Sequence, residues 1–391
     1  MPASLPRRRR VALLIETSNA YARGLLEGVM TYVRRHDPWS LYLPELRRGE
    51  VPSDWLSQWK GDGIVARIEN AATARAVAAT QLPVVDVSSA RLLPDVPWVE
   101  TDDEAIARLA FDHLRDRGFK QFAYCGDSRF NWSRWREEHF VQRVVDAGLN
   151  CVVYQSVTSK RTRPTDDERK RLIRWVRELP KPIGILACYD IQAQRLLDAC
   201  RDADVAVPEE AAVLGVDDDR LLCDLCTPAL SSIIPDTQRA GYGAAEILDP
   251  MLRGKAAPVA ELLVPPRGVA VRQSTDVLAL DDRDVAAAVR MIREHACNGI
   301  NVEDVLKQIP LSRRVFESRF RKHLGRTPHD EILRIKLDRV KQLLDETDLT
   351  LDEIATRSGF RHVEYLSVAF KRVVGLPPSR YRSAGRSKAK V

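Results

Sequence analysis

The sequence predicts two parts of different fold class, an α/β part made of two similar lobes and an all-α part that follows it. Apolar runs alternate with helical patterns from Val11 to about residue 282, whereas residues 301–378 contain one helical pattern twice. The chain length of 391 residues also favours more than one core. A composition of 45% hydrophobic and 30% charged residues is typical of globular proteins, and no apolar run is long enough to cross a membrane.

The α/β part is predicted from short, continuous apolar runs, as in parallel strands that are buried on both faces. Helical patterns separate these runs, and such alternation favours a parallel sheet. We expect two lobes because the units outnumber the strands of one doubly wound sheet. The predicted strands are Val11–Ile15, Leu41–Leu43, Gly63–Ile68, Val84–Val87, Phe122–Cys125, Cys151–Tyr154, Ile183–Cys188 and Val213–Val216, and one predicted helix covers 102–117.

Polar and aromatic residues follow four of these strands, where open α/β sheets bind ligands. Carboxylates and Arg can pair with neighbouring hydroxyl groups, and an aromatic ring can cover the C–H face of a sugar. Each residue also has a structural alternative: the aspartates could cap helices, Arg136 could form a surface ion pair, and the rings could pack in a core or hinge. The predicted sugar-binding residues are Asn19, Tyr21, Trp132, Arg136, Asp190 and Asp217.

The all-α part is predicted from two copies of a helix–turn–helix pattern, residues 301–328 and 349–378. Phe320, Gly325 and Pro328 recur 50 residues later as Phe370, Gly375 and Pro378. Thr350 and Glu353 have the spacing of a capping box, and Gly359 supplies the positive φ that a sharp turn needs. The expected core residues of the two second helices are Val315, Phe316, Phe320, Tyr365, Leu366, Ala369 and Phe370.

A single helix over Thr327–Thr347 is predicted to join the copies. At about 1.5 Å per residue it spans roughly 31 Å, close to the ~34 Å of one turn of B-DNA. The second helix of each copy is then suited to a major groove, where Arg can bind guanine and Glu can accept from cytosine. Val363 and Val368 are apolar exceptions, and Val363 could instead contact a thymine methyl. The predicted DNA-contacting residues are Arg313, Arg314, Glu317, Ser318, Arg361, His362, Glu364 and Ser367.

The charge distribution agrees with DNA binding by the second part alone. Residues 283–391 contain 23 Lys and Arg against 14 Asp and Glu, a net charge of +9. The whole chain carries +6, so the remainder carries −3. A basic part beside a slightly acidic one is expected when only the first meets phosphates.

Metal, cofactor and enzyme chemistry find little support in the sequence. The seven cysteines include one CxxC pair, Cys223 and Cys226, with no second pair nearby, so we expect no metal site and a reducing cytoplasm. Gly61-Asp62-Gly63 leads into a strand instead of a helix, which argues against a dinucleotide site. No cofactor is predicted. An enzyme fused to a DNA-binding part would need a nucleophile–base pair, and a purely architectural protein would not need the polar loops after the strands.

The repeated part resembles the AraC/XylS family of transcription regulators over residues 284–382. The resemblance rests on Asp352-Glu353-Ile354-Ala355, Gly359-Phe360, Phe370-Lys371, Pro378 and Tyr381-Arg382. One departure is Val340, where the family usually has Ala. The first part resembles the LacI-type, periplasmic-binding-protein-like sensor domain through Gly184–Asp190, Val213–Asp218 and Pro228–Ser232.

These resemblances imply a sensor domain over 1–275, a linker over 276–283, a double helix-turn-helix domain over 284–382 and a basic, irregular tail over 383–391. A LacI-type sensor followed by an AraC-type domain is similar to regulators of xylose use. It implies double-stranded DNA as partner, D-xylose as effector, a homodimer in the cytoplasm, and contact with RNA polymerase if the regulator activates. Another pentose or related sugar, and repression instead of activation, are the alternatives.

Overall fold

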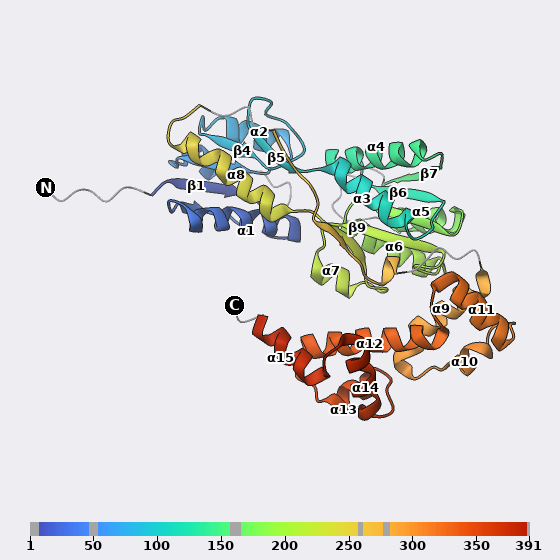
Figure 1. Cartoon of the computed structure of the whole chain (residues 1–391). Helices are drawn as coiled ribbons and strands as arrows, with labels where there is room; N and C mark the ends of the chain where they lie inside the picture. The colour runs from blue at the N-terminus through green and yellow to red at the C-terminus, as the bar shows by residue number, and fades with distance from the viewer. Residues whose placement is uncertain (1–7, 47–53, 157–165, 257–260, 277–281, 389–391) are drawn as a thin grey trace. The chain divides into compact units, whose positions relative to one another are not determined.

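The computed structural model describes residues 8–46, 54–156, 166–256, 261–276 and 282–388, which form two compact units, Met1–Val277 and Leu278–Val391. Residues 277–281 of the predicted linker and 389–391 of the predicted tail lie outside the described residues. Residues 383–388 of the tail are helical instead of irregular, because the helix that begins at Pro378 continues to Lys388. Figure 1 shows the two sheets and the helical unit.

The first lobe of unit one is a parallel sheet with strand order β11-β5-β4-β3-β1-β2. Its strands are β1 (Arg10–Leu14), β2 (Ser40–Tyr42), β3 (Gly63–Ala66), β4 (Val84–Asp86), β5 (Trp98–Thr101) and β11 (Glu261–Val264). Helices α1 (Ala20–Arg35), α2 (Ala71–Ala78) and α8 (Thr237–Leu252) pack on this sheet, with a 3-10 turn at Asp54–Gln58.

The second lobe has strand order β12-β10-β9-β8-β6-β7, and β12 is antiparallel to β10. Its strands are β6 (Phe122–Gly126), β7 (Cys151–Gln155), β8 (Ile183–Ala187), β9 (Ala211–Val216), β10 (Ser231–Ile234) and β12 (Gly268–Ala270). Its helices are α3 (Asp103–Arg115), α4 (Asn131–Asp146), α5 (Asp166–Glu178), α6 (Asp190–Asp202) and α7 (Arg220–Leu225), followed by a 3-10 turn at Gln273–Thr275.

All eight predicted strands are present, with ends that differ by one or two residues, but β5, β10, β11 and β12 were not predicted. Polar residues break the apolar pattern in two of them. Strand β5 contains Glu100 and Thr101, and β10 begins with Ser231 and Ser232, yet all four side chains are buried. A search for apolar runs misses strands of this kind.

Helices α1 and α8 lie side by side against the first sheet (Figure 1). Their contact depends on glycine, because a Cβ at Gly28 would lie 2.1 Å from the Gln238 carbonyl oxygen and one at Gly241 would lie 2.0 Å from that of Leu25. Helix α8 follows β10 of the other lobe. The chain crosses between lobes here, again from β5 into α3, and again from β11 into β12. These three crossings join the two lobes.

The helical unit consists of α9 (Arg283–His295), a 3-10 turn at Ala296–Asn298, α10 (Val302–Leu306), α11 (Arg313–Leu324), α12 (Pro328–Glu346), α13 (Leu351–Arg357), α14 (Val363–Val374) and α15 (Pro378–Lys388). Helix α12 is the predicted connecting helix, and it supplies residues to two separate cores. Ile332 belongs to the core under α11, and Leu337 belongs to the core under α14. The two helix-turn-helix copies are therefore fixed to one rigid helix.

The local signals in the second copy are confirmed. Thr350 and Glu353 form a capping box, and Gly359 has φ 72°. Two predicted core residues are wrong: Val315 is 39% exposed and Tyr365 is 49% exposed. Val315 and Tyr365 each lie one residue before a buried residue, Phe316 or Leu366. Neighbouring residues of a helix point in different directions, so Val315 and Tyr365 face the solvent.

Candidate functional site

A cavity of about 310 Å³ lies between the two lobes of unit one. This volume is at the small end of the range for small-molecule sites. The six predicted sugar-binding residues all line it, although they come from different elements: Asn19, Tyr21, Trp132, Arg136, Asp190 and Asp217. Residues not predicted from the sequence complete the lining, among them Arg67, Ser88, Glu100, Thr101 and Tyr189. The structure brings the predicted residues together around one cavity.

Arg136, on α4, is only 3% exposed and is held on two sides. Its Nε donates to Asp103 Oδ1 at 2.5 Å, and its Nη1 donates to the Cys188 carbonyl oxygen at 2.7 Å. Burial works against the charged form, but Asp103 keeps the pKa of Arg136 above its ordinary value. The alternative that Arg136 forms an ion pair at the surface is therefore wrong, because the pair is buried. The guanidinium is a fixed, buried cation at the cavity wall.

Asp190, the first residue of α6, already has protein partners for both carboxylate oxygens. Oδ1 accepts from Ser232 Oγ at 2.6 Å, and Oδ2 accepts from the Asp219 backbone N–H at 2.8 Å. Burial, with the nearby charge of Asp217, raises the pKa of Asp190 well above its usual range. Asp190 thus connects the start of α6 with strand β10 and with the loop after β9, and any ligand contact would add to these bonds.

Asp217 follows β9 and has φ 115°, a left-handed conformation that is strained for a residue with a side chain. Strained backbone persists where the surrounding structure enforces it, and it concentrates at ligand sites. Here Asp217 N donates to the Ile233 carbonyl oxygen, which fixes the loop after β9 against β10. This geometry places the Asp217 side chain in the cavity lining.

Tyr21 and Asn19 lie at the start of α1. The Asn19 side chain caps the helix by accepting from Ala22 N at 2.8 Å, and its Nδ2 donates to Glu16 at 2.9 Å. Burial raises the pKa of Tyr21 to about 12, so this phenol is a neutral donor or acceptor. Arg67 lies 5.3 Å from the ring of Tyr21. Asn19 therefore has a structural role in addition to its place in the cavity.

Arg67 is a further buried cation that the sequence analysis missed. It pairs with Glu16 and, at 2.6 Å, with Glu69, while its Nε is buried and without a hydrogen-bond partner among the described residues. Burial would lower the pKa of Arg67, but Glu69 and Glu16 raise it overall. Arg67 therefore adds a second buried cation to the lining of the cavity.

Glu100 and Trp132 give the cavity a polar and an aromatic wall. Burial and neighbouring Asp103 raise the pKa of Glu100 to about 8, while Arg91 donates to it at 3.1 Å. Trp132 is 8% exposed and stacks on Phe130 with ring centres 4.9 Å apart. Two cations, several carboxyl groups and an aromatic ring in one small cavity can bind a polyhydroxy compound through hydrogen bonds and ring contact.

The predicted DNA-contacting residues of the first copy lie on α11. Arg313, Arg314, Glu317 and Ser318 share a surface hollow with Arg321 and Lys322. Arg313 donates to Glu303 at 2.7 Å and to Glu317 at 2.9 Å. Arg314 forms no ion pair or side-chain hydrogen bond with the described residues. Arg314 can therefore bind a base without first breaking an ion pair, whereas Arg313 would have to leave its glutamate partners.

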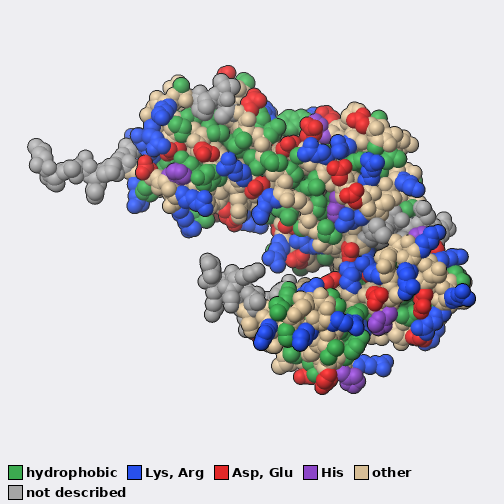
Figure 2. All heavy atoms as spheres, in the orientation of Figure 1, with side chains coloured by type: hydrophobic (Ala, Val, Ile, Leu, Met, Phe, Trp, Pro, Cys, Tyr) green, Lys and Arg blue, Asp and Glu red, His purple; other side chains and the backbone are tan. Residues whose placement is uncertain are grey.

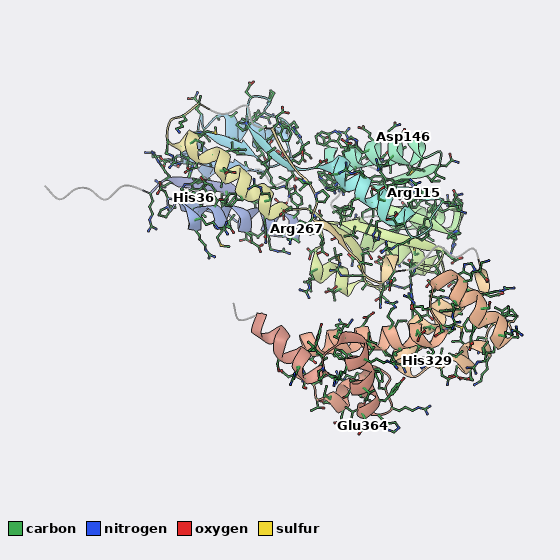
Figure 3. The ribbon with its side chains drawn as sticks, viewed as in Figure 1. His36, Arg115, Asp146, Arg267, His329 and Glu364 are labelled. Carbon is green, nitrogen blue, oxygen red and sulfur yellow. The ribbon has the colours of Figure 1, made fainter. Side chains whose placement is uncertain are left out.

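The predicted residues of the second copy surround the start of α14. His362 is the N-cap residue, Arg361 precedes it, and both are exposed. Glu364 is exposed at the outer surface of the helical unit, on the far side of α14 from α12 (Figure 3), and Ser367 is partly buried. Figure 2 shows Lys and Arg side chains spread over the visible face of this unit.

The described residues contain no group of three or more His, Cys, Asp or Glu that could hold a metal ion. All seven cysteines are free thiols. Within the described part of the chain, no helix is long and apolar enough to span a membrane.

Models of known domain families match the chain in three consecutive segments. An XylR N-terminal domain matches residues 10–104, a periplasmic binding protein-like domain matches 111–275, and a helix-turn-helix domain matches 305–384. A periplasmic binding protein/LacI transcriptional regulator from Alkaliphilus metalliredigens, complexed with D-xylulofuranose, shares the fold of the first part. Its TM-score is 0.55 at 17% identity, over 68% of this chain and 98% of that chain.

Proteins that match nearly the whole chain show which family has this combination of domains. The xylose operon regulatory protein of Escherichia coli K12 is 34% identical over 386 residues, 96% of this chain and 97% of that protein. Its Haemophilus influenzae counterpart is 31% identical over 95% of this chain and 98% of that protein. The structure of the xylose-binding transcription activator XylR matches with a TM-score of 0.83 and 33% identity, over 97% of this chain and 98% of that chain. The chain therefore belongs to the family of xylose operon regulatory proteins, which regulate transcription through a helix-turn-helix domain and are not enzymes.

Proposed function

We propose that D-xylose is the effector of this regulator and that it binds in the cavity between the two lobes. The observation that carries the proposal is the convergence of buried Arg136 and Trp132, both on α4, with half-buried Asp217 after β9, on one cavity of about 310 Å³. The similar solved structure is that of a xylose-binding activator, which supports the choice of sugar. We assign ligand contact to Asn19, Tyr21, Trp132, Arg136, Asp190 and Asp217, with Arg67 and Glu100 added.

The switch follows from the position of the cavity. A sugar that bonds to both lobes favours the closed arrangement over the open one, and a ligand can shift an equilibrium only by such differential affinity. We propose that closure changes DNA binding by α11 and α14 in a homodimer in the cytoplasm, and that the chain activates transcription through RNA polymerase. Repression relieved by sugar is the alternative output.

Titration calorimetry with D-xylose, L-arabinose, D-ribose, D-xylulose and D-glucose tests the effector. We expect heat of binding with D-xylose and at least tenfold weaker binding of the others, because a wrong sugar leaves buried polar groups unpaired. If another pentose gives heat of binding and D-xylose gives none, D-xylose is not the effector, but the proposed sugar site stands.

Asp217→Asn tests the site itself, because it removes the charge and keeps the shape. We expect D-xylose affinity to fall by tenfold or more. Asp204→Asn is the matched control, since Asp204 also has positive φ, 56°, but lies exposed outside the cavity. Equal losses in both variants would show an effect of loop conformation and not of ligand contact.

Band-shift assays with the chain's own upstream DNA, with and without D-xylose, test the output. We expect D-xylose to change DNA affinity by at least fivefold, which corresponds to typical coupling between two sites. A transcription assay with purified RNA polymerase then separates activation from relief of repression.

A further inference from the structure

The two recognition helices can be compared residue by residue because the repeat is in register. Phe316 and Phe320 of α11 are buried, as are Leu366 and Phe370 of α14, each 50 residues later. The outward residues must therefore correspond as well. Arg313, Arg314, Glu317 and Ser318 of α11 correspond to Val363, Glu364, Ser367 and Val368 of α14.

The first helix presents hydrogen-bonding side chains at all four positions, whereas the second has valine at two. Val363 is partly buried, because it packs against the core beneath α14. Val368 is 66% exposed and occupies the centre of the outward face, one turn after Glu364. It is flanked by Tyr365, 49% exposed, and by exposed Arg372.

The chemistry of the major groove limits what such a side chain can recognise. The base edges there present hydrogen-bond donors and acceptors and a single apolar group, the C5-methyl of thymine. Valine has no donor or acceptor, so only this methyl group gives it a specific contact. Exposed Lys371 and Arg372 lie on the same face of α14 and suit phosphates, which favours DNA as the occupant over an apolar protein surface.

We propose that the two recognition helices bind different half-sites by different chemistry. Helix α11 recognises base edges by hydrogen bonds through Arg314, and α14 recognises thymine methyl groups through Val368, with Tyr365 beside it. This inference rests on DNA binding by both helix-turn-helix copies. It makes the operator asymmetric, with one half-site containing guanine and the other containing thymine at the position under Val368.

Replacing thymine by deoxyuridine tests the contact, because it removes the methyl group and keeps every hydrogen-bonding group of the base pair. The probe is the segment of the chain's own upstream DNA that the full-length protein protects from nuclease. Each thymine of that segment is replaced in turn, and affinity is measured by fluorescence anisotropy. We expect about a fourfold loss at one or two thymines of one half-site, equivalent to about 0.8 kcal/mol for each buried methyl.

Val368→Ala should weaken this discrimination, because alanine keeps only the Cβ of the apolar side chain. Val373→Ala is the matched control, because Val373 is 58% exposed on the same helix but lies about 140° around it from Val368. Since both side chains are exposed, the two variants should keep the melting temperature of the parent chain.

Three results would overturn the inference while leaving the proposed function intact. The parent chain binds the thymine and deoxyuridine probes equally; Val368→Ala keeps the full discrimination; or Val368→Ala keeps DNA recognition and loses only transcriptional output, which would assign the patch to a protein partner. If the parent chain binds its upstream DNA no better than a scrambled fragment, the proposed function fails and this inference fails with it.

Discussion

The cavity and the recognition helices both depend on arginine, but the two regions hold it differently. Arg136 is 3% exposed and is fixed by Asp103 and a backbone carbonyl. Arg313 has a side chain 59% exposed, and its partners Glu303 and Glu317 are also at the surface. Breaking a buried pair is costly, whereas exposed pairs contribute little. The comparison indicates that the arginine of the cavity is held in one position, whereas that of the recognition helix can exchange its partners.

The largest expected effect comes from breaking the buried pair. Arg136→Met leaves the Asp103 carboxylate buried without its cation, so we expect unfolding free energy to fall by about 3–5 kcal/mol and D-xylose binding to be lost. Urea unfolding measures the first and calorimetry the second. Arg143→Met, on the exposed face of the same helix, should change stability by less than about 0.5 kcal/mol.

A double variant separates stability from binding. Asp103→Leu combined with Arg136→Met replaces the ion pair by apolar side chains, which often restores stability. We expect the double variant to unfold close to the parent chain and still not to bind D-xylose. Recovered sugar binding would show that Arg136 supports the fold and does not contact the ligand.

On the DNA-binding surface the effects are smaller and differ between two neighbours. Arg314→Ala should reduce the preference for operator over mutated operator by about 1–3 kcal/mol, the contribution of one base-contacting arginine. Arg313→Ala should reduce this preference by a smaller amount, because the Arg313 guanidinium must break its bonds to Glu303 and Glu317 before it can bind a base. Anisotropy titrations of both variants decide the order, and a larger loss for Arg313→Ala would assign base contact to it instead.

The cavity should also make the stability of the fold depend on pH. Burial and Asp103 raise the pKa of Glu100 to about 8, against about 4.3 when unfolded. Between these pH values the folded chain holds a proton that the unfolded chain has lost. The contribution of Glu100 to stability is therefore complete below about pH 4.3 and is lost as the pH rises to about 8.

Urea unfolding between pH 5.5 and 8 measures this effect. In the parent chain, the unfolding free energy should fall with rising pH by at most about 1.4 kcal/mol per pH unit, the limit for one proton. Glu100→Gln should remove this fall. Glu104→Gln, an exposed change in the first turn of α3, should leave the decline as it is. An unchanged slope in Glu100→Gln would contradict the raised pKa.

Much of the cavity could be predicted because strand ends are local signals. Asp190 and Asp217 each follow an apolar run, and parallel strands bring such positions to one edge. Arg67 was missed because the strand was extended to Ile68, two residues past its end at Ala66. Glu100 was missed because its strand, β5, carries buried polar residues and so does not form an apolar run. The repeat predicted both recognition helices, but not which neighbour of each core residue faces outward.

The smallest effect concerns the link between cavity and linker. Arg272 Nη1 donates to Asp218 Oδ1 at 2.8 Å, and Asp218 N donates at 3.0 Å to Ser232 Oγ, which in turn bonds to Asp190 in the cavity wall. Arg272 also donates to Asp224 at 2.9 Å. A continuous set of hydrogen bonds thus connects the cavity to a residue close to the end of unit one, at Val277.

If this set transmits closure, Arg272→Gln should leave D-xylose affinity within about twofold and weaken the effect of D-xylose on DNA affinity by about 0.5–2 kcal/mol. Arg267→Gln is the control, since Arg267 lies exposed in the segment between β11 and β12 (Figure 3). Full coupling in Arg272→Gln would exclude this route. It would then favour movement of the lobes as whole bodies, because a rigid displacement of β10 and β12 needs no single side chain to carry it.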